Sequence, residues 1–215
     1  MIDSRCLFWH RRDLRIEDNI GLAKATKSTS AITGVFVLDE HIFLSTNDSQ
    51  KLSPAQTWFL TRSLEELSNK WNEIGSELII LYGDPIKLIP RLANIIKADV
   101  VTWNNDIEPR ERLIEKEISI ELKKNGIKVF CYWDQLLIDP NKLLTKTGAP
   151  YKVYTPFWRN WKAQVDEKYN ESNSLKDVLP NIDKTNSLLK LSKDKRKLID
   201  RFLKKNILNN PYNVF

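Results

Sequence analysis

Residues 31–38 read AITGVFVL, an unbroken apolar run that is rich in β-branched side chains. A strand covered on both faces has this character, because neither face needs polar residues, and such strands are typical of parallel sheets. Further short apolar runs occur at residues 6–9 (CLFW), 78–82 (LIILY), 100–103 (VVTW) and 129–132 (VFCY). The sequence therefore predicts five buried parallel strands.

Helical patterns occupy the segments between these runs. Ser53 and Gln56 have the spacing of a capping box, with Pro54 at the first helical position. Apolar residues then recur every three or four positions as far as Gly75, a typical residue after a helix end. Further helices are predicted at residues 20–25, from 85 to about 96 and from 109 to about 125. This alternation predicts a doubly wound, Rossmann-like α/β fold, with a five-stranded parallel sheet and helices on both faces.

Length and charge divide the chain into three parts. Its 215 residues are 41% hydrophobic and 29% charged, which is typical of a globular protein. The net charge is +6, and the basic excess is largest near the C-terminus. We expect an α/β domain at residues 1–135, a connector at 136–165 and a basic C-terminal extension at 166–215 that is partly helical or disordered.

Several classes of protein are disfavoured by what the sequence omits. Two cysteines, Cys6 and Cys131, and two histidines, His10 and His41, argue against a disulfide framework or a zinc site. No apolar stretch approaches the roughly 20 residues of a membrane span and no signal peptide is evident, so we expect a cytoplasmic protein without membrane contact. The glycine motifs of dinucleotide-binding enzymes and P-loop proteins, and the G-x-S-x-G of esterases, are also missing.

The expected fold predicts where a ligand should bind. In open α/β sheets, ligands lie outside the carboxyl ends of the strands, where the strand order reverses. The segments that leave those ends are Trp9–Asp13, Leu38–His41 and Asn104–Glu108. The first carries guanidinium groups and the last carries carboxylates and amides. This combination suits a polar, planar ligand in a pocket with apolar walls.

Three segments resemble the DNA photolyase/cryptochrome family. WHRRDLRIEDN, at residues 9–19, resembles the opening signature of that family. WNNDIEP, at 103–109, is similar to a segment of class I bacterial photolyases, especially the cyanobacterial ones. WDQLLIDP (133–140) and GAPYKVYTPFWRNW (148–161) together resemble the end of the family's N-terminal domain. The resemblance covers roughly residues 5–162.

The resemblance implies the light-harvesting part of a deoxyribodipyrimidine photolyase-like DNA-repair protein. In the family, this α/β domain holds an antenna pigment, either a deazaflavin (8-hydroxy-5-deazaflavin) or a folate (5,10-methenyltetrahydrofolate). A separate helical domain binds reduced FAD and UV-damaged DNA, and splits the pyrimidine dimer. The chain ends where that domain would begin. We therefore expect no carbon–carbon lyase activity from the chain alone, and a separate FAD-binding domain or chain as its partner.

The resemblance also implies a set of antenna-binding residues, with no catalytic residue and no metal ligand. They are Arg11, Asp13, Phe36, Leu38, Asp106 and Glu108. Carboxylates would accept hydrogen bonds from ring N–H or hydroxyl groups, a guanidinium would hold a carbonyl or phenolate, and Phe36 would pack on a ring face. Gln56 stands where deazaflavin-binding members carry an arginine, and residues 110–112 (RER) keep part of the folate-binding pattern. On balance the sequence favours a deazaflavin over a folate.

Other interpretations stay open at this point. The domain could be a stand-alone nucleotide-binding module, a cryptochrome-like signalling module or a ligand-free remnant. Asp106 and Glu108 would also serve as caps for the helix at Pro109, and Glu108 could pair with Arg112. The arginines at 11, 12 and 15 could pair with the acids at 13, 17 and 18. Finally, Trp58 and Trp71 are expected to be packing residues, and the two histidines to be ordinary loop residues.

Overall fold

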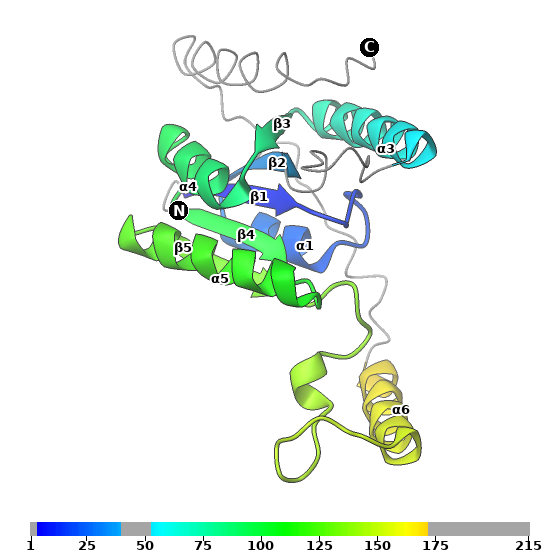
Figure 1. The fold of residues 1–215 in the computed structure, drawn as a ribbon. Helices are drawn as coiled ribbons and strands as arrows, with labels where there is room; N and C mark the ends of the chain where they lie inside the picture. Colours follow the sequence, from blue (N-terminus) through cyan, green and yellow to red (C-terminus); the bar gives the residue numbers. More distant parts are fainter. Residues whose placement is uncertain (1–3, 40–52, 172–215) are drawn as a thin grey trace, which may run out of the picture.

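One parallel sheet forms the centre of the molecule (Figure 1). The structure is a computed structural model and describes residues 4–39 and 53–171. The strands are β1 (Arg5–His10), β2 (Ala31–Asp39), β3 (Leu78–Gly83), β4 (Val100–Asn104) and β5 (Lys128–Tyr132). They pair in the order β3-β2-β1-β4-β5, and the four pairings of these strands are all parallel. The predicted five-stranded parallel sheet is confirmed.

The strand order reverses beside β1. From β1 the chain proceeds outward through β2 to β3, and then crosses to β4 and β5 on the other side. β1 and β4 are in register up to the pair Trp9 and Trp103, so their carboxyl ends lie next to each other. This is the place where a doubly wound sheet leaves room for a ligand.

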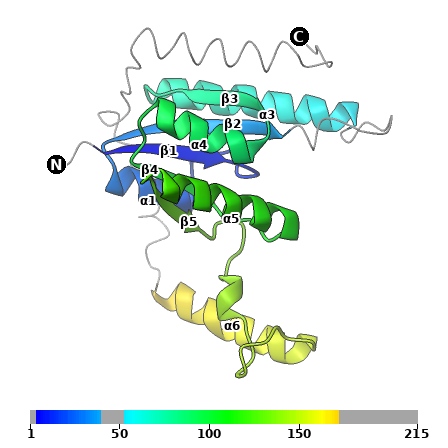
Figure 2. The ribbon, with the colours of Figure 1, turned by 60° about the vertical axis from the view of Figure 1, so that its left-hand side comes forward.

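Helices cover both faces of the sheet (Figure 2). One face packs against α4 (Pro85–Ile95) and α5 (Pro109–Lys124), in a core that includes Leu7 and Trp9 of β1. The other face packs against α1 (Ile20–Ser28) and α3 (Pro54–Glu73), in a core that includes Cys6 and Phe8. Alternate residues of β1 thus enter opposite cores, as the pleat of a strand requires. The predicted doubly wound arrangement is confirmed.

Local signals in the sequence fix where these helices begin. The Asn19 side chain accepts a hydrogen bond from Leu22 N at the start of α1. Ser53 and Gln56 form the predicted capping box of α3. At the start of α4, the Asp84 carboxylate accepts from a backbone N–H. Each cap satisfies donors that the first helical turn leaves without a partner.

Trp71 ties α3 closely to the sheet. Its side chain is 1% exposed, and its ring lies against Gly34 of β2, where an added Cβ would come within 2.7 Å of it. Glycine is therefore required here for the close approach of helix and strand. The packing role predicted for Trp71 is confirmed. The one predicted for Trp58 is wrong, because that side chain is 63% exposed on the first turns of α3.

A smaller unit follows the sheet. It comprises the 3₁₀ turn η1 (Pro140–Lys142) and the helix α6 (Tyr154–Glu171), which stand apart from the α/β body in both views (Figures 1 and 2). None of the described residues from 139 to 166 is buried. The predicted domain boundaries stay a prediction: α6 runs across position 165, and most of the predicted basic tail lies outside the described residues. Within the described ranges, no helix combines the length and apolar character needed to cross a membrane.

Candidate functional site at the carboxyl edge of the sheet

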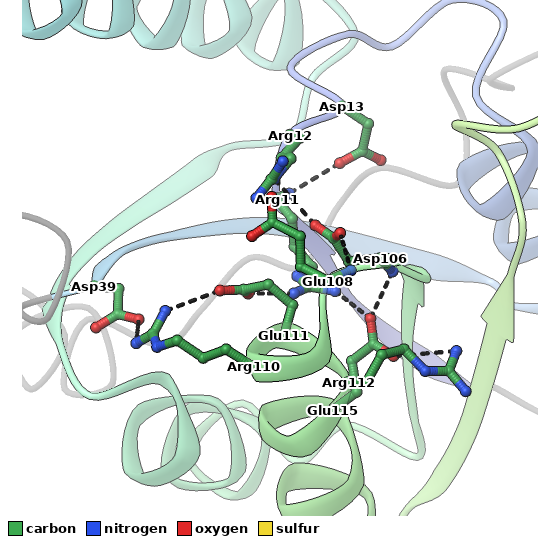
Figure 3. A network of polar contacts seen from close by, with 10 residues as sticks. All are labelled: Arg11, Arg12, Asp13, Asp39, Asp106, Glu108, Arg110, Glu111, Arg112 and Glu115. Atoms are coloured by element: carbon green, nitrogen blue, oxygen red, sulfur yellow. Dashed lines mark hydrogen bonds and ion pairs between the residues drawn. The ribbon is translucent and has the colours of Figure 1, made fainter.

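The loops that follow β1 and β4 meet at the carboxyl edge of the sheet. Arg12, just after β1, extends its guanidinium across to the β4 loop. Its Nε lies 3.0 Å from Asp106 Oδ2, and its Nη2 lies 2.7 Å from Glu108 Oε1 (Figure 3). Asp106 and Glu108, both predicted as site residues, thus share one cation. We call these three residues the edge cluster.

The edge cluster combines accessible and buried groups. The Arg12 and Glu108 side chains are 55% and 51% exposed, whereas that of Asp106 is 1% exposed. The hydrogen bond to Glu108 raises the pKa of Arg12, against the effect of its partial burial. Asp106 Oδ2 is ion-paired with Arg12 but receives no hydrogen bond, because the guanidinium is close without being well aligned with it. This carboxylate oxygen therefore keeps an unused acceptor position, although it is covered in the present arrangement.

Arg11 points away from the edge cluster, into the interior. Its guanidinium donates to Glu111 and Glu115, one turn apart on α5, and lies over the Trp9 ring at 4.7 Å. The side chain is only 5% exposed. Arg11 therefore fastens the β1 loop to α5 through charge-assisted hydrogen bonds. Its predicted side-chain partners in its own loop are wrong, because its carboxylate partners lie about 100 residues further along the chain.

Asp13 organises the other side of the same loop. Its Oδ1 accepts from the backbone N–H of Arg11, and its Oδ2 accepts from the side-chain amides of Asn19 and Asn104. Asn104 in turn accepts from the backbone N–H of Gly21 at the start of α1. The Asp13 side chain is thus buried and fully hydrogen-bonded, and it holds together β1, β4 and α1.

His10 is buried as well, which corrects its predicted place in a loop. It ends β1, and its Nε2 accepts from Trp71 Nε1 at 3.0 Å. An indole N–H can only donate, so we assign the imidazole proton to Nδ1, which then donates to Asp13 O at 3.0 Å. Burial lowers the pKa of His10 below its ordinary value of 6.5, despite the nearby Asp13. His41 lies outside the described residues.

A third contact joins the end of β2 to α5. Arg110 Nη2 lies 2.6 Å from Asp39 Oδ2, and its Nη1 lies 2.9 Å from Glu111 Oε1. Partial burial is the largest single effect on Arg110 and works against its charged form, but the hydrogen bonds and charges of Asp39 and Glu111 together outweigh it and raise the pKa of that guanidinium. The tips of β1, β2 and β4 are therefore connected to one another through the first two turns of α5 (Figure 3).

Phe36 and Leu38 lie on the face of the sheet opposite α5. Phe36 is 8% exposed inside the core formed with α1 and α3, and Leu38 is half-buried against the same core. The structure brings Asp106 and Glu108 together, and it buries Arg11 and Asp13, each engaged in bonds of its own. It does not bring Phe36 and Leu38 into the polar network. Their contact with a pigment stays a prediction.

The helix-cap interpretation of the two acids is only partly supported. Glu108 occupies the N-cap position of α5 but makes no side-chain cap bond. Asp106 Oδ1 accepts from the backbone N–H of Glu108 at 3.0 Å, which closes the turn before the helix. The predicted pairing of Glu108 with Arg112 is wrong, because Glu108 pairs with Arg12, and Arg112 faces Glu115 at 3.8 Å.

Among the arginines of this edge that were not predicted as site residues are Arg12 and Arg110. Arg12 was missed because its neighbour Arg11 matched the family motif equally well. The period-2 alternation of β1 could have separated them, since Trp9 faces the α5 core and Arg11, two residues on, follows it inward. For Arg110, no local signal could have identified Asp39 as its partner, 71 residues earlier in the chain.

The remaining reactive side chains have ordinary explanations. Burial raises the pKa values of both Cys6 and Cys131 to about 12, which disfavours a thiolate nucleophile at either position. In the part of the chain that the structure describes, no group of three or more His, Cys, Asp or Glu side chains could hold a metal ion. The polar network at the carboxyl edge is thus the feature that calls for a functional explanation.

Comparisons with known proteins extend this description. The family model described as DNA photolyase matches residues 6–177. A deoxyribodipyrimidine photo-lyase from Synechococcus is 46% identical over 158 residues, which are 74% of this chain and 32% of the relative. The corresponding protein of Agrobacterium fabrum is 33% identical over 71% of this chain and 30% of its own length. An uncharacterised 31.6 kDa Synechococcus protein is 40% identical, over 73% of this chain and 54% of that protein.

Solved structures give the same result. A class III photolyase from Agrobacterium tumefaciens has a TM-score of 0.64 and 31% identity, over 75% of this chain and 32% of that one. A Synechocystis cryptochrome has a TM-score of 0.68 and 27% identity, over 76% and 34%. An archaeal photolyase from Sulfolobus tokodaii, solved with two FAD molecules that imply a novel light-harvesting cofactor, has a TM-score of 0.60 and 28% identity, over 73% and 34%. The chain spans about a third of the photolyases and cryptochromes it matches.

Proposed function

We propose a light-harvesting function from the premise that this chain belongs to the DNA photolyase family. It corresponds to the N-terminal domain of its photolyase relatives and spans 32% of the Synechococcus one. In the proposed function, the carboxyl edge of the sheet binds an antenna pigment, and the absorbed energy passes to a flavin held elsewhere. The observation that carries the proposal is the edge cluster, where Arg12, Asp106 and Glu108 meet beside the reversal of strand order.

The chemistry of the edge cluster fits a planar heterocycle with N–H or O–H donors. Asp106 Oδ2 receives no hydrogen bond but is covered, with Arg12 Nε at 3.0 Å, so a ring N–H could donate to it once the exposed Arg12 side chain moves aside. The Glu108 carboxylate, half-exposed, could accept from a hydroxyl, and the exposed guanidinium of Arg12 could donate to a ring carbonyl or phenolate. A deazaflavin such as 8-hydroxy-5-deazaflavin offers these groups, and we favour it over 5,10-methenyltetrahydrofolate.

The proposal assigns catalysis to another domain or chain. FAD binding, contact with UV-damaged DNA and cleavage of the pyrimidine dimer would reside there, and the α/β domain alone would lack lyase activity. The matched region makes up 54% of the 31.6 kDa Synechococcus relative and 32% of the photolyase, so it also occurs in a shorter protein. We retain the cytoplasmic location as part of this proposal.

A pigment-binding measurement tests the function. The purified chain is incubated with 8-hydroxy-5-deazariboflavin and passed over a gel-filtration column. We expect a near-UV to blue absorption band to elute with the protein at about one pigment per chain. Glu108→Gln and Asp106→Asn keep the side-chain shapes, and each should weaken binding by about tenfold, the effect of one charge-assisted hydrogen bond.

Glu117→Gln is the matched control, because Glu117 is exposed further along α5 and away from the strand tips. This variant should bind the pigment as the unmodified chain does. Elution of the unmodified chain without pigment, or equal binding by the Glu108 and Glu117 variants, would contradict the proposed site. Dimer repair in light by the isolated chain would contradict the proposed division of labour.

A further inference from the structure

The arginines at the carboxyl edge are already engaged with carboxylates. Arg11 contacts two acids on α5, and Arg12 contacts both acids of the β4 loop. Arg15 pairs in the same way with Asp134 and Arg110 with Asp39, at 2.6 Å each, and Arg112 lies 3.8 Å from Glu115. In the edge cluster, one guanidinium faces two carboxylates. Its formal charge is therefore negative.

The helix starts at this edge are also occupied. A free helix N-terminus is the usual binding site for a phosphate, because its N–H groups point outward with the positive end of the dipole. At the start of α1, the N–H of Leu22 donates to the Asn19 side chain at 3.0 Å. The N–H of Ile20 donates to the Asp134 carboxylate at 2.9 Å. In the first turns of α3 and α4, a backbone N–H donates a hydrogen bond to the side chain of the helix's own N-cap residue.

The start of α5 is closed to anions for a different reason. Its first residue is Pro109, which has no N–H, and its N-cap residue Glu108 brings a carboxylate to the same place. An anionic group that approached here would meet repulsion in place of the attraction that a helix N-terminus ordinarily supplies. Along the described part of this edge, the tail of a ligand would therefore meet helix N-termini whose N–H groups are already hydrogen-bonded and arginines that are already paired with carboxylates.

We propose that this edge selects a pigment without an anionic tail, and that Glu108 determines this specificity. The inference rests on the proposed function, since it concerns the choice of ligand at the same site. A ring system with a neutral ribityl chain would be accepted, whereas the same ring with a phosphate or an oligoglutamate chain would be disfavoured. The selection is a case of specificity through repulsion, because the carboxylates exclude a competitor that would otherwise make the same ring contacts.

The test uses two pigments that differ only in the tail. The Kd of the full chain is measured for 8-hydroxy-5-deazariboflavin and for its 5′-phosphate, by fluorescence titration at low salt. The ring is common to both, so its own ionisation cancels in the comparison. We expect the phosphate ester to bind about tenfold more weakly, and the ratio to shrink towards one as salt screens the repulsion.

Variants at Glu108 assign the effect to a residue. Glu108→Gln should bring the two Kd values together, and Glu108→Lys should reverse their order in favour of the phosphate ester. Glu117→Lys makes the same change in net charge further along α5, on an exposed position, and should leave the ratio unchanged. These variants are compared as ratios of Kd, so a general loss of affinity does not imitate the result.

The outcomes separate the two proposals. Binding of both pigments, with the phosphate ester equal or tighter on the unmodified chain, overturns the specificity and leaves the light-harvesting function in place. If Glu108→Lys and Glu117→Lys change the ratio of the two Kd values equally, the role of Glu108 is overturned. Binding of neither pigment contradicts the proposed function itself, and the inference falls with it.

Discussion

Arg11 is a cation held between two carboxylates, with little access to solvent. Replacing it by Met would leave Glu111 and Glu115 partly buried without their shared partner. Removal of one member of a buried ion pair typically costs about 3–5 kcal/mol of unfolding free energy. We therefore expect Arg11→Met to lower the urea midpoint strongly. The control is Arg62→Gln on α3, whose pair with Glu65 is exposed and should contribute less than about 1 kcal/mol.

An equal effect of the two arginine substitutions would show that Arg11 is solvated and does not tie β1 to α5. The double variant with Glu115→Gln adds a second check. Residues in direct contact are coupled, so the loss in the double variant should be smaller than the sum of the two single losses.

His10 makes stability depend on pH. Burial lowers its pKa in the folded state, with Asp13 opposing the shift and Arg15 adding to it. Below pH 6.5, its ordinary value, the unfolded chain binds a proton that the folded chain resists. This contribution to stability is therefore complete above pH 6.5 and falls as the pH drops, by at most about 1.4 kcal/mol per pH unit. Urea unfolding of the chain and of His10→Gln at pH 7.5 and 5.5 measures the difference.

In His10→Gln, the loss of stability between these two pH values should be smaller than in the unmodified chain. The Gln side chain can still accept a hydrogen bond from the Trp71 indole, so the two proteins differ in protonation at position 10 more than in packing. Parallel pH profiles for the two proteins would show that His10 is protonated at little cost in the folded state.

At the scale of single residues, the sequence predicted the chemistry of the site better than its connections. Asp106 and Glu108 do meet an arginine of the β1 loop, because parallel strands deliver their carboxyl ends to one edge. The arginine is Arg12, while Arg11 turns inward to acids about 100 residues away on α5. Such partners depend on how α5 packs on the sheet, which the local sequence does not determine.

At the scale of secondary structure, Gly34 allows α3 to lie directly on β2. A methyl group at this position would meet the Trp71 indole at 2.7 Å, and Trp71 is held in place by its bond to His10. Overpacking of this kind typically costs about 1–3 kcal/mol. We expect Gly34→Ala to lower the unfolding free energy by this amount, measured by urea unfolding. The penalty should shrink in a Trp71→Phe background, because the smaller ring removes the indole atoms nearest to the new methyl group.

A penalty that is the same in both backgrounds would mean that Gly34 is needed for its backbone and not for the approach of Trp71.

The helices and strands themselves were predictable from the sequence, and the reason is physical. Their limits are set by residues in contact with the adjacent backbone, such as Asn19 and Ser53, so short stretches of sequence suffice. The exposure of Trp58 was not predictable in that way, since it depends on which side of α3 meets the sheet.

At the scale of the whole molecule, the sheet and its helices should be stable without α6. The described residues from 139 to 166 include none that is buried, whereas both cores lie within the α/β body. A chain that ends at residue 139 should therefore unfold cooperatively, with a free energy within about 1 kcal/mol of the full chain. It should also bind the pigment with unchanged affinity. Circular dichroism during urea unfolding and the pigment titration measure the two quantities.

Loss of cooperative unfolding in the shortened chain would show that α6 contributes to the fold in a way that burial does not reveal. The shortened chain also separates the proposed pigment site from any partner surface on α6. That helix carries Tyr154 and Trp158, which are 72% and 41% exposed.

The fastening of three strand tips to α5 has a consequence for the kinetics of ligand capture. Arg11, Arg110 and Asp13 hold the ends of β1, β2 and β4 in one arrangement. A pigment would then meet strand ends whose backbone is already set, with only the exposed Arg12 side chain to move, and little conformational entropy would be lost on association. Capture should proceed in a single step that is first order in pigment, without a slow rearrangement. Differences in affinity between pigments should consequently arise in the dissociation rate, that is, in the residence time of each pigment.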